Sequence, residues 1–240
     1  MTLIRSLLFV VWMYGLVLVM GLVGIWLLLC PRSWVRAYYR LWLALVFGGL
    51  KVICGLRYKV EGLENIPEGG ALIASKHQSM METQAFWQIL PDPAIILKKE
   101  LAYLPFFGWF AVKLGNIVVD RGAAAKALRK MLGDARRWAG DGRQILIFPE
   151  GTRMAPFETD EFKPGVAGLY SAMKAPCVPV ALNTGHFWAG RGVIRKPGVA
   201  TIRFLEPIAP GLPREDFMAL LKQRIDTATA ELEAGLETKR

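Results

Sequence analysis

The sequence predicts an α/β fold with a mixed, partly parallel sheet flanked by helices, preceded by an N-terminal apolar two-helix membrane segment. Three observations support this prediction. The N-terminal part of the chain is strongly apolar, short apolar runs recur after it, and helical patterns lie between several of these runs. Strands that alternate with helices are typical of a parallel or mixed sheet covered by helices. We therefore expect a membrane-associated segment over residues 1–54 and an α/β domain over residues 55–240.

The composition indicates a protein that works at a membrane surface. Of the 240 residues, 53% are hydrophobic, and the formal net charge is +10. A basic chain of this kind binds either nucleic acid or an anionic membrane surface. The sequence contains no RNA-binding signature, zinc finger or basic zipper, and a membrane also explains the apolar N-terminus. We therefore expect anionic membrane lipids as partners and no nucleic acid.

The cysteines and histidines are too few and too scattered to predict a metal site or a disulfide framework. The three cysteines are Cys30, Cys54 and Cys177, and the chain has two histidines. An odd number of cysteines without regular spacing is typical of free thiols in a reducing compartment. A zinc site needs a closer cluster of ligands than these residues offer. We predict no bound metal.

The region from Ser6 to Cys30 carries no charged residue. It is about 25 residues long, enough to cross a bilayer with some tilt. Trp12, Tyr14 and Trp26 fit the aromatic anchors found at membrane interfaces. A cleaved signal peptide fits less well, because the apolar stretch is long and no small-residue cleavage site follows it.

The charges that flank this region predict its orientation. Arg32, Arg36 and Arg40 follow it, whereas only Arg5 precedes it. If the helix spans the membrane, the positive-inside rule places its C-terminal side in the cytoplasm. The second apolar run, Leu41–Leu50, is too short to span alone, so we predict a helix that returns to the surface or lies in the interface plane. Hydropathy leaves open whether the two helices span the bilayer or enter one leaflet.

The rest of the chain alternates between predicted strands and helices. The predicted strands are Leu56–Val60, Ala71–Ala74, Ala94–Leu97, Asn116–Val119, Gln144–Phe148, Val178–Leu182 and Val199–Phe204. Apolar residues at helical spacing predict a helix over 124–137, whose opposite face is basic, and a C-terminal helix over 217–232.

A polar turn follows the strand Ala71–Ala74 and opens a helix. His77 lies in this turn, and Glu82 follows with four residues between them. In a continuous helix two such positions point about 140° apart, so the side chains meet only if His77 lies in the turn and Glu82 in the first helical turn. Ser79-x-x-Glu82 is typical of a capping box, which fits that geometry. Two interpretations stay open: Glu82 orients His77 as a general base, or it only caps the helix.

A second polar turn ends the strongly apolar strand Gln144–Phe148. Glu150 and Arg153 lie in it, and the carboxyl ends of strands are where α/β sheets place ligands. Gly151 allows close approach of the backbone. The two side chains are therefore candidates to bind polar groups of a substrate, and a glycine turn with a solvated arginine is the competing interpretation.

Two further cations close predicted strands. Arg121 stands at the start of the basic helix, where free backbone N–H groups and a guanidinium together bind anions. The competing interpretation is an Asp120–Arg121 surface pair, which contributes little. Lys99 follows the strand Ala94–Leu97 and is a candidate phosphate contact, or else part of a solvated run of charges.

Other catalytic motifs are missing from the sequence. It has no Gly-x-Ser-x-Gly elbow, no Gly-x4-Gly-Lys phosphate loop and no Gly-x-Gly-x-x-Gly motif. His186 has no acidic neighbour close in sequence. We predict that it is a loop residue that faces either the site or the membrane interface.

The order of the motifs resembles that of the glycerolipid acyltransferase family, and within it the 1-acylglycerol-3-phosphate O-acyltransferases. A His-x4-acid motif begins at His77, Gly-x-Ile-x-Val-Asp-Arg ends at Arg121, Phe-Pro-Glu-Gly-Thr-Arg ends at Arg153, and Val-Pro-Val follows. The likeness extends roughly from Leu56 to Pro207. The family usually has Asp at the position of Glu82, but a glutamate can still accept an imidazole N–H.

The resemblance implies transfer of an acyl group from acyl-CoA or acyl-carrier protein to the 2-hydroxyl of lysophosphatidic acid, which gives phosphatidic acid. His77 would be the general base, oriented by Glu82, and no covalent acyl-enzyme or further cofactor would be needed. The substrate-binding residues that it implies are Arg121 and Arg153 with Lys99 for the phosphate, Glu150 for the glycerol portion, and Gly151 and Thr152 in the same motif.

The implied location is the cell inner membrane, with the catalytic domain on the cytoplasmic side. Two alternatives remain for the function. In the first alternative, the acceptor is lyso-ornithine lipid or another lysophospholipid. In the second, the chain is a non-enzymatic membrane lipid-binding protein. A membrane-anchored nucleic-acid binder is suggested by net charge alone, and basic residues spread over helices are more typical of a solvated or lipid-facing surface.

Overall fold

The structure is a computed structural model, and it describes residues 1–120, 122 and 124–237. Across these residues the strands form one seven-stranded sheet in the order β1–β7–β6–β2–β5–β3–β4. The strands are β1 (Leu56–Glu61), β2 (Ala71–Ser75), β3 (Pro93–Lys98), β4 (Ile117–Val119), β5 (Gln144–Ile147), β6 (Cys177–Leu182) and β7 (Gly198–Phe204). Each predicted strand overlaps one of these, and the mixed α/β fold is confirmed.

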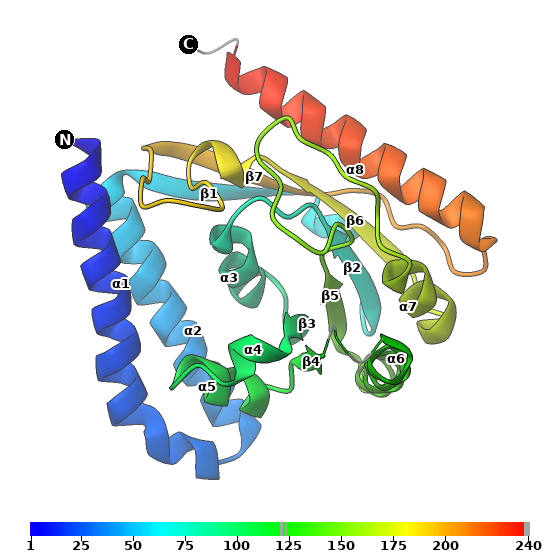
Figure 1. The fold of residues 1–240 in the computed structure, drawn as a ribbon, viewed down its shortest axis with the longest axis horizontal. Coiled ribbons are helices and arrows are strands. Elements are labelled where there is room, and N and C mark those ends of the chain that lie inside the picture. Colours follow the sequence, from blue (N-terminus) through cyan, green and yellow to red (C-terminus); the bar gives the residue numbers. More distant parts are fainter. Residues whose placement is uncertain (121, 123, 238–240) are drawn as a thin grey trace.

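All neighbouring strands are parallel except β6 and β7, which are antiparallel. Strands β2, β5 and β3 therefore lie side by side in the middle of the sheet with their carboxyl ends at one edge (Figure 1). Loops at that edge of an α/β sheet are where ligands usually bind. The polar turns predicted after β2 and β5 are thus brought next to each other.

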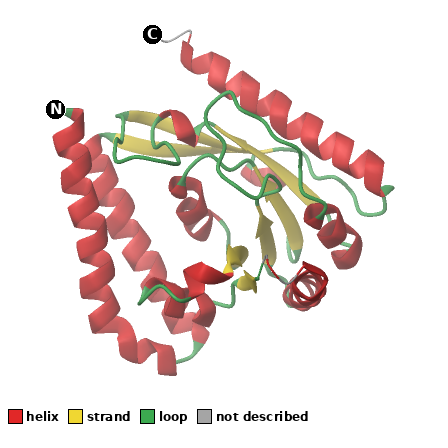
Figure 2. Ribbon diagram, viewed as in Figure 1, coloured by secondary structure: helices red, strands yellow, loops and turns green. Residues whose placement is uncertain are grey.

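Helices cover both faces of the sheet, as Figure 2 shows. One face carries α3 (Met80–Ile89), α4 (Lys99–Ala102) and α5 (Phe107–Lys113); the other carries α6 (Ala124–Gly140), α7 (Gly165–Met173) and α8 (Arg214–Glu237). Successive strand residues point to opposite faces, so in β2 Ile73 belongs to one hydrophobic cluster and Leu72 to the other. The predicted helices over 124–137 and 217–232 are confirmed as α6 and α8.

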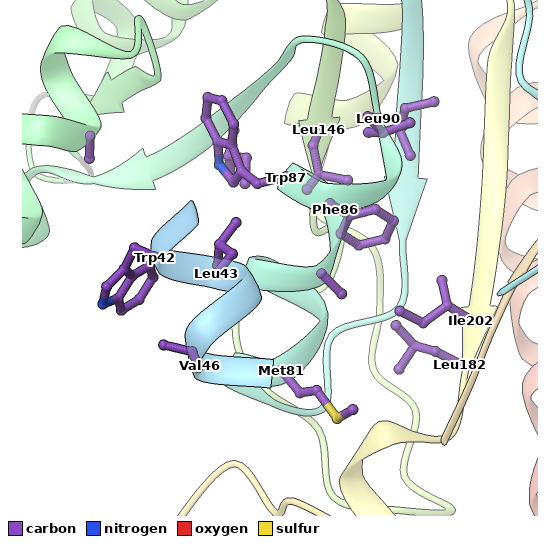
Figure 3. Close-up of a cluster of buried hydrophobic side chains, with 14 of the residues drawn as sticks. Trp42, Leu43, Val46, Met81, Phe86, Trp87, Leu90, Leu146, Leu182 and Ile202 are labelled. Atoms are coloured by element: carbon purple, nitrogen blue, oxygen red, sulfur yellow. The ribbon is translucent and has the colours of Figure 1, made fainter. Parts of the chain in front are cut away.

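The N-terminal segment is a helical hairpin that packs against the domain. It consists of α1 (Thr2–Gly24), a short 3₁₀ turn η1 (Ile25–Leu29), α2 (Arg32–Gly49) and a π turn η2 (Leu50–Cys54). By length and composition, both arms of the hairpin are long and apolar enough to cross a membrane. In Figure 3, Leu43 and Val46 lie on α2, and Met81 lies on the neighbouring helix α3. They are buried in the same hydrophobic cluster, so the hairpin and the domain share one core.

The three arginines of α2 bind the domain. Arg32 donates through Nη1 to Asp92 over 2.8 Å, and Arg36 Nη1 lies 3.2 Å from the same carboxylate. Arg40 donates through Nη2 to the carbonyls of Leu90 and Pro91, both at 2.8 Å. Their spacing of four residues puts them on one face of the helix. The loop before β3 therefore anchors α2, and the positive charges that predicted an orientation are used inside the protein.

The segment that contains α4 and α5 forms a wedge, Lys99–Lys113, beside the hairpin. At its tip Phe106 has φ 60°, a conformation that costs a bulky residue free energy. Its ring lies on α1 at Gly21, where an added Cβ would come within 2.4 Å of Phe106 Cγ. Tyr103 and Leu104 of the wedge are exposed. The strained turn is thus held by close contact with α1.

Candidate active site

The turn after β2 positions a histidine and a glutamate against each other. Ser79 is the N-cap of α3: its hydroxyl accepts from the Met81 N–H over 3.1 Å, while Glu82 accepts from the Ser79 N–H over 2.6 Å. This is the predicted capping box. The same Glu82 oxygen lies 2.9 Å from Nδ1 of His77. One carboxylate therefore caps the helix and also contacts the imidazole, so Glu82 does more than cap α3.

The contact with Glu82 determines which nitrogen of His77 is free to act as a base. A carboxylate only accepts hydrogen bonds, so the hydrogen of the neutral imidazole lies on Nδ1 and the lone pair on Nε2. Among the described residues no group hydrogen-bonds Nε2. The His77 side chain is 14% exposed, whereas that of Glu82 is fully buried. The imidazole is therefore partly exposed, whereas the carboxylate that contacts it is shielded from water.

Thr184 completes the environment of the carboxylate. Its hydroxyl donates to Oε2 of Glu82 over 2.7 Å. Gln78 N–H adds a bond of 2.8 Å to Oε1. Thr184 lies in η5 (Thr184–His186), after β6, and the sequence interpretation missed it. The only signal was its position just beyond the carboxyl end of a predicted strand, where site residues gather.

His77 opens into a cleft of about 450 Å³ at the carboxyl ends of β2, β3 and β5. Its ring stacks on Phe148 with the ring centres 3.9 Å apart. One wall is apolar and includes Ile96 and Met131. The cleft thus joins a base to a lining that suits an acyl chain or the apolar part of a lipid.

Three cations lie along the same cleft: Lys98, Arg153 and Lys163. Arg153 is exposed and donates to the Gly190 carbonyl over 3.3 Å, and it lines the same cleft as His77. Lys98 and Lys163 were not among the predicted site residues. Together these side chains give the cleft a positive rim that favours a phosphate group.

Glu150 does not face the cleft, and its predicted contact with substrate needs correction. Its side chain is fully buried and forms an ion pair with Lys76 at 2.6 Å. Its other oxygen accepts from the backbone N–H of His77 over 3.1 Å. Burial raises the pKa of Glu150, and the hydrogen bonds from Lys76 and His77 oppose that rise. Glu150 supports the turn that carries the base.

Lys99 belongs to a different surface. It lines a separate cleft with Lys126 and Lys130, and its ammonium pairs with Asp120 at 2.6 Å. Hydrogen bonds from Lys99 and Gly122 hold the pKa of the Asp120 carboxyl below its ordinary value. The lysine that lines the His77 cleft is therefore Lys98, the last residue of β3, and not Lys99.

The remaining predicted residues divide as follows. Gly151 lines the cleft and has φ 73°, a conformation that favours glycine, whereas Thr152 is exposed and is not among the lining residues. Arg121 lies outside the described residues. His186 is not among the residues that line the cleft, and its Nε2 lies 3.2 Å from Oε1 of Glu233 in α8. In the part of the chain that the structure describes, no cluster of ligand residues forms a metal site.

Comparison with known proteins shows which family this chain resembles. The sequence matches the Acyltransferase family over residues 57–183. It is 34% identical to a Pseudomonas aeruginosa protein named 1-acyl-sn-glycerol-3-phosphate acyltransferase, over 85% of this chain and 77% of that one. A human protein of the same name, form beta, is 28% identical over 71% of this chain and 63% of its own length.

A solved structure shares the fold over nearly the whole length. The 1-acyl-sn-glycerophosphate acyltransferase of Thermotoga maritima superposes with a TM-score of 0.81, covers 98% of each chain and is 24% identical in sequence. The similarity therefore includes the N-terminal hairpin as well as the sheet. From its match to the family over more than half its length and from the Pseudomonas relative, this chain belongs to the acyltransferase family.

Proposed function

We propose that this protein transfers an acyl group from acyl-CoA or acyl-carrier protein to the 2-hydroxyl of lysophosphatidic acid. The observation that carries the proposal is the His77–Glu82 pair, with Nε2 directed to a cleft that has an apolar wall and a cationic rim. The names of the curated relatives supply the acceptor, because they act on 1-acyl-sn-glycerol-3-phosphate. A lysophospholipid has both features that this cleft would recognise, an acyl chain and a phosphate.

The proposed reaction needs one proton acceptor. The acceptor hydroxyl attacks the thioester carbonyl carbon and its proton passes to Nε2 of His77, while a carbon–oxygen bond forms. The carbon–sulfur bond then breaks, and His77 returns the proton to the departing thiolate. A positioned base contributes about 10²–10⁴-fold in rate, and alignment of two bound substrates contributes about 7–11 kcal/mol. Glu82 stabilises the imidazolium that exists between the two transfers.

The cationic rim would bind the acceptor phosphate. Arg153 offers a planar fork of donors that matches two phosphate oxygens, and Lys98 and Lys163 add positive charge on the same cleft. Binding there would leave the glycerol hydroxyl close to the base. Arg121 follows β4 and stays a predicted phosphate ligand.

The membrane would be reached through the outer face of α1. Leu8, Val11 and Leu22 are among its exposed apolar residues, whereas α2 packs on the domain. This arrangement favours a hairpin that enters one leaflet, because lipid cannot surround a helix whose inner face is covered by protein. We propose an inner-membrane location with the catalytic domain on the cytoplasmic side. Protease accessibility in intact and inverted vesicles tests that orientation.

The central experiment measures acyl transfer to lysophosphatidic acid by the purified protein and by His77→Ala. We expect the substitution to lower the activity by at least about 10²-fold. His186→Ala is the matched control, because it removes the other histidine of the chain, which lies outside the cleft, and it should stay active. Full activity of His77→Ala would exclude His77 as the base. A panel of acyl-CoA and acyl-carrier protein donors identifies the thioester.

A second experiment tests the acceptor. Arg153→Ala should raise the KM for lysophosphatidic acid more than the KM for phosphate-free lyso-ornithine lipid. Arg191→Ala, an exposed arginine outside the cleft, should change neither. An equal effect of Arg153→Ala on both acceptors would favour the alternative in which the phosphate is not recognised.

A further inference from the structure

Two opposite charges are buried directly behind the catalytic histidine. The side chains of Lys76 and Glu150 are both fully buried, with Nζ and Oε1 2.6 Å apart. Neither is among the residues that line the cleft, and the reaction uses neither. Burial of two charges costs several kcal/mol for each ion, and a hydrophobic pair of the same size often gives equal or greater stability. The pair therefore calls for a role other than stability.

The other hydrogen bonds of Glu150 and Lys76 indicate what this role is. Glu150 holds the His77 backbone N–H through Oε2, while the N–H of Met154 donates to the His77 carbonyl over 2.7 Å. Both peptide groups of His77 are thus bound by the loop after β5. Lys76 in turn donates to the carbonyl of Glu158 over 2.8 Å. These bonds fasten the turn after β2 to the turn after β5.

The orientation of the imidazole depends on these bonds as well as on Glu82. Glu82 fixes Nδ1 and Phe148 covers one ring face, but both contacts act on the side chain only. If the backbone of His77 rotates, Nε2 turns away from the cleft even when the Glu82 bond stays intact. The hydrogen bond from the His77 backbone N–H to Glu150 restrains this rotation.

We propose that Lys76 and Glu150 form a buried clamp that positions His77, in which the Lys76 ammonium keeps Glu150 ionised and Glu150 holds the His77 backbone. The proposal rests on the assignment of His77 as the base. A charged acceptor makes a hydrogen bond roughly twice as strong as a neutral one. Burial alone raises the pKa of Glu150, and Lys76 opposes that rise. Without the ammonium, only the contact with His77 opposes the rise in the pKa of Glu150, which favours the protonated carboxyl and a weaker bond to His77. Both residues are thus positioning residues.

Kinetics of three variants test the clamp. Lys76→Met leaves a buried carboxyl without its partner, and Glu150→Gln leaves a buried ammonium without its partner. We expect each to lower kcat by about 10–100-fold, with the KM of both substrates changed less than about twofold. The double variant Lys76→Met/Glu150→Gln removes both charges of the pair, and its amide oxygen still accepts from the His77 N–H. It should recover kcat to within about fivefold of the unaltered protein.

Selective labelling provides a readout that does not depend on activity. The chain has two histidines, so labelling with ¹⁵N-histidine gives backbone amide signals from His77 and His186 alone. In Lys76→Met we expect faster hydrogen exchange at His77, little change at His186, and partial recovery of protection in the double variant. Arg143→Met is the control for general destabilisation, because Arg143 is also a buried cation but lies away from the cleft.

Three results would overturn the clamp. The first is a rise in acceptor KM of tenfold or more in Glu150→Gln with unchanged kcat, which would make Glu150 a substrate ligand. The second is a loss of activity in the single variants that matches the loss of folded protein, as in Arg143→Met. The third is unchanged exchange at His77. If His77→Ala stays active, the base assignment fails, and the exchange at His77 still decides whether the clamp exists.

Discussion

At the scale of single residues, one carboxylate oxygen connects folding to catalysis. Oε1 of Glu82 accepts from the N–H groups of Gln78 and Ser79 and contacts Nδ1 of His77. The first two bonds start α3, and the third orients the imidazole. The longer side chain of glutamate, compared with aspartate, is compatible with all three. Cap and base partner are therefore one group, and a substitution can separate them.

Glu82→Gln separates the cap from the charge. The amide oxygen still accepts from the two backbone N–H groups, so we expect a loss of only about 1 kcal/mol in the free energy of unfolding. The negative charge that stabilises the imidazolium is lost, so kcat should fall by about 10²–10⁴-fold. Initial rates and thermal unfolding measure the two effects. Glu100→Gln, at a first-turn position of α4, is the control, and a small change in kcat for Glu82→Gln would contradict the dyad.

Thr184→Val tests the hydroxyl that supports Glu82. The substitution leaves Oε2 of a buried carboxylate without its donor, so we expect a loss of about 1–3 kcal/mol in stability and a lower kcat. Thr184→Ser should behave like the unaltered protein. The buried hydroxyl of Thr229 has no hydrogen-bond partner among the residues that the structure describes, which makes Thr229→Val a matched control with little loss. Equal effects of Thr184→Val and Thr229→Val would show that the Glu82 contact contributes nothing.

The capping box and the His77–Glu82 contact were predictable because both depend on positions close together in the sequence. Thr184 was not, because it lies 102 residues from Glu82 and reaches it only through the order of strands in the sheet. The side to which a residue points after a strand ends was equally unpredictable. Lys98 rather than Lys99 lines the cleft, and Glu150 turns inward to Lys76. A motif identifies the turn but not the direction of each side chain in it.

At the scale of the elements, α2 is attached to the domain by an aspartate that binds several arginines. Burial alone would raise the pKa of the Asp92 carboxyl. The hydrogen bonds from Arg32 and the positive charges of Arg143 and Arg36 outweigh that effect, so the pKa lies below its ordinary value. The folded protein therefore binds a proton at Asp92 less readily than the unfolded chain does. The carboxylate stabilises the fold in its ionised form.

This shift predicts a pH-dependent attachment of α2. The contribution of Asp92 is complete above its ordinary pKa of about 3.9 and is lost as the pH falls through its lower value in the folded state. Near neutral pH we expect Asp92→Asn to cost about 2 kcal/mol. The difference should shrink as the pH decreases from about 5 to below 3. Denaturation of the unaltered protein and of Asp92→Asn in detergent, across this pH range, measures the difference in their free energies of unfolding. A difference that does not change with pH would contradict the ion-pair account.

The strands were predictable because each is a short apolar run bounded by turn residues, and α6 and α8 because their apolar residues recur at helical spacing. Helices α5 and α7 escaped prediction. Both are short, and α7 is apolar almost throughout, so neither shows the alternation between apolar and polar faces that marks a helix. The docking of α2 depends on Asp92, which lies 60 residues beyond Arg32. No periodicity within the helix signals such a partner.

At the scale of the whole molecule, the hairpin and α8 lie at opposite sides of the sheet (Figure 1). Exposed apolar residues gather on α1 and continue onto the wedge, where Tyr103 and Leu104 are exposed. Leu101 of the same wedge lines the His77 cleft. A lipid surface that contacts α1 and the wedge would therefore lie next to the cleft, and a lipid acceptor could enter without crossing water.

Charge substitution on α1 tests this lipid contact. Transfer of a leucine side chain from water to an apolar medium contributes about 1.5–3 kcal/mol, so Leu8→Glu should weaken binding to vesicles of phosphatidylethanolamine and phosphatidylglycerol by tenfold or more. Leu212→Glu is the control, because Leu212 is also exposed but lies before α8. Sedimentation with vesicles measures the binding. Equal loss in both variants would mean that α1 has no special contact with lipid.

The arginines of α2 are synthesised well before the aspartate that neutralises two of them. Asp92 follows Arg32 by 60 residues, so both arginines leave the ribosome before the carboxylate does. Until the loop before β3 has formed, neither guanidinium has this partner. The attachment of α2 to the domain is therefore completed only after a much later part of the chain has been made.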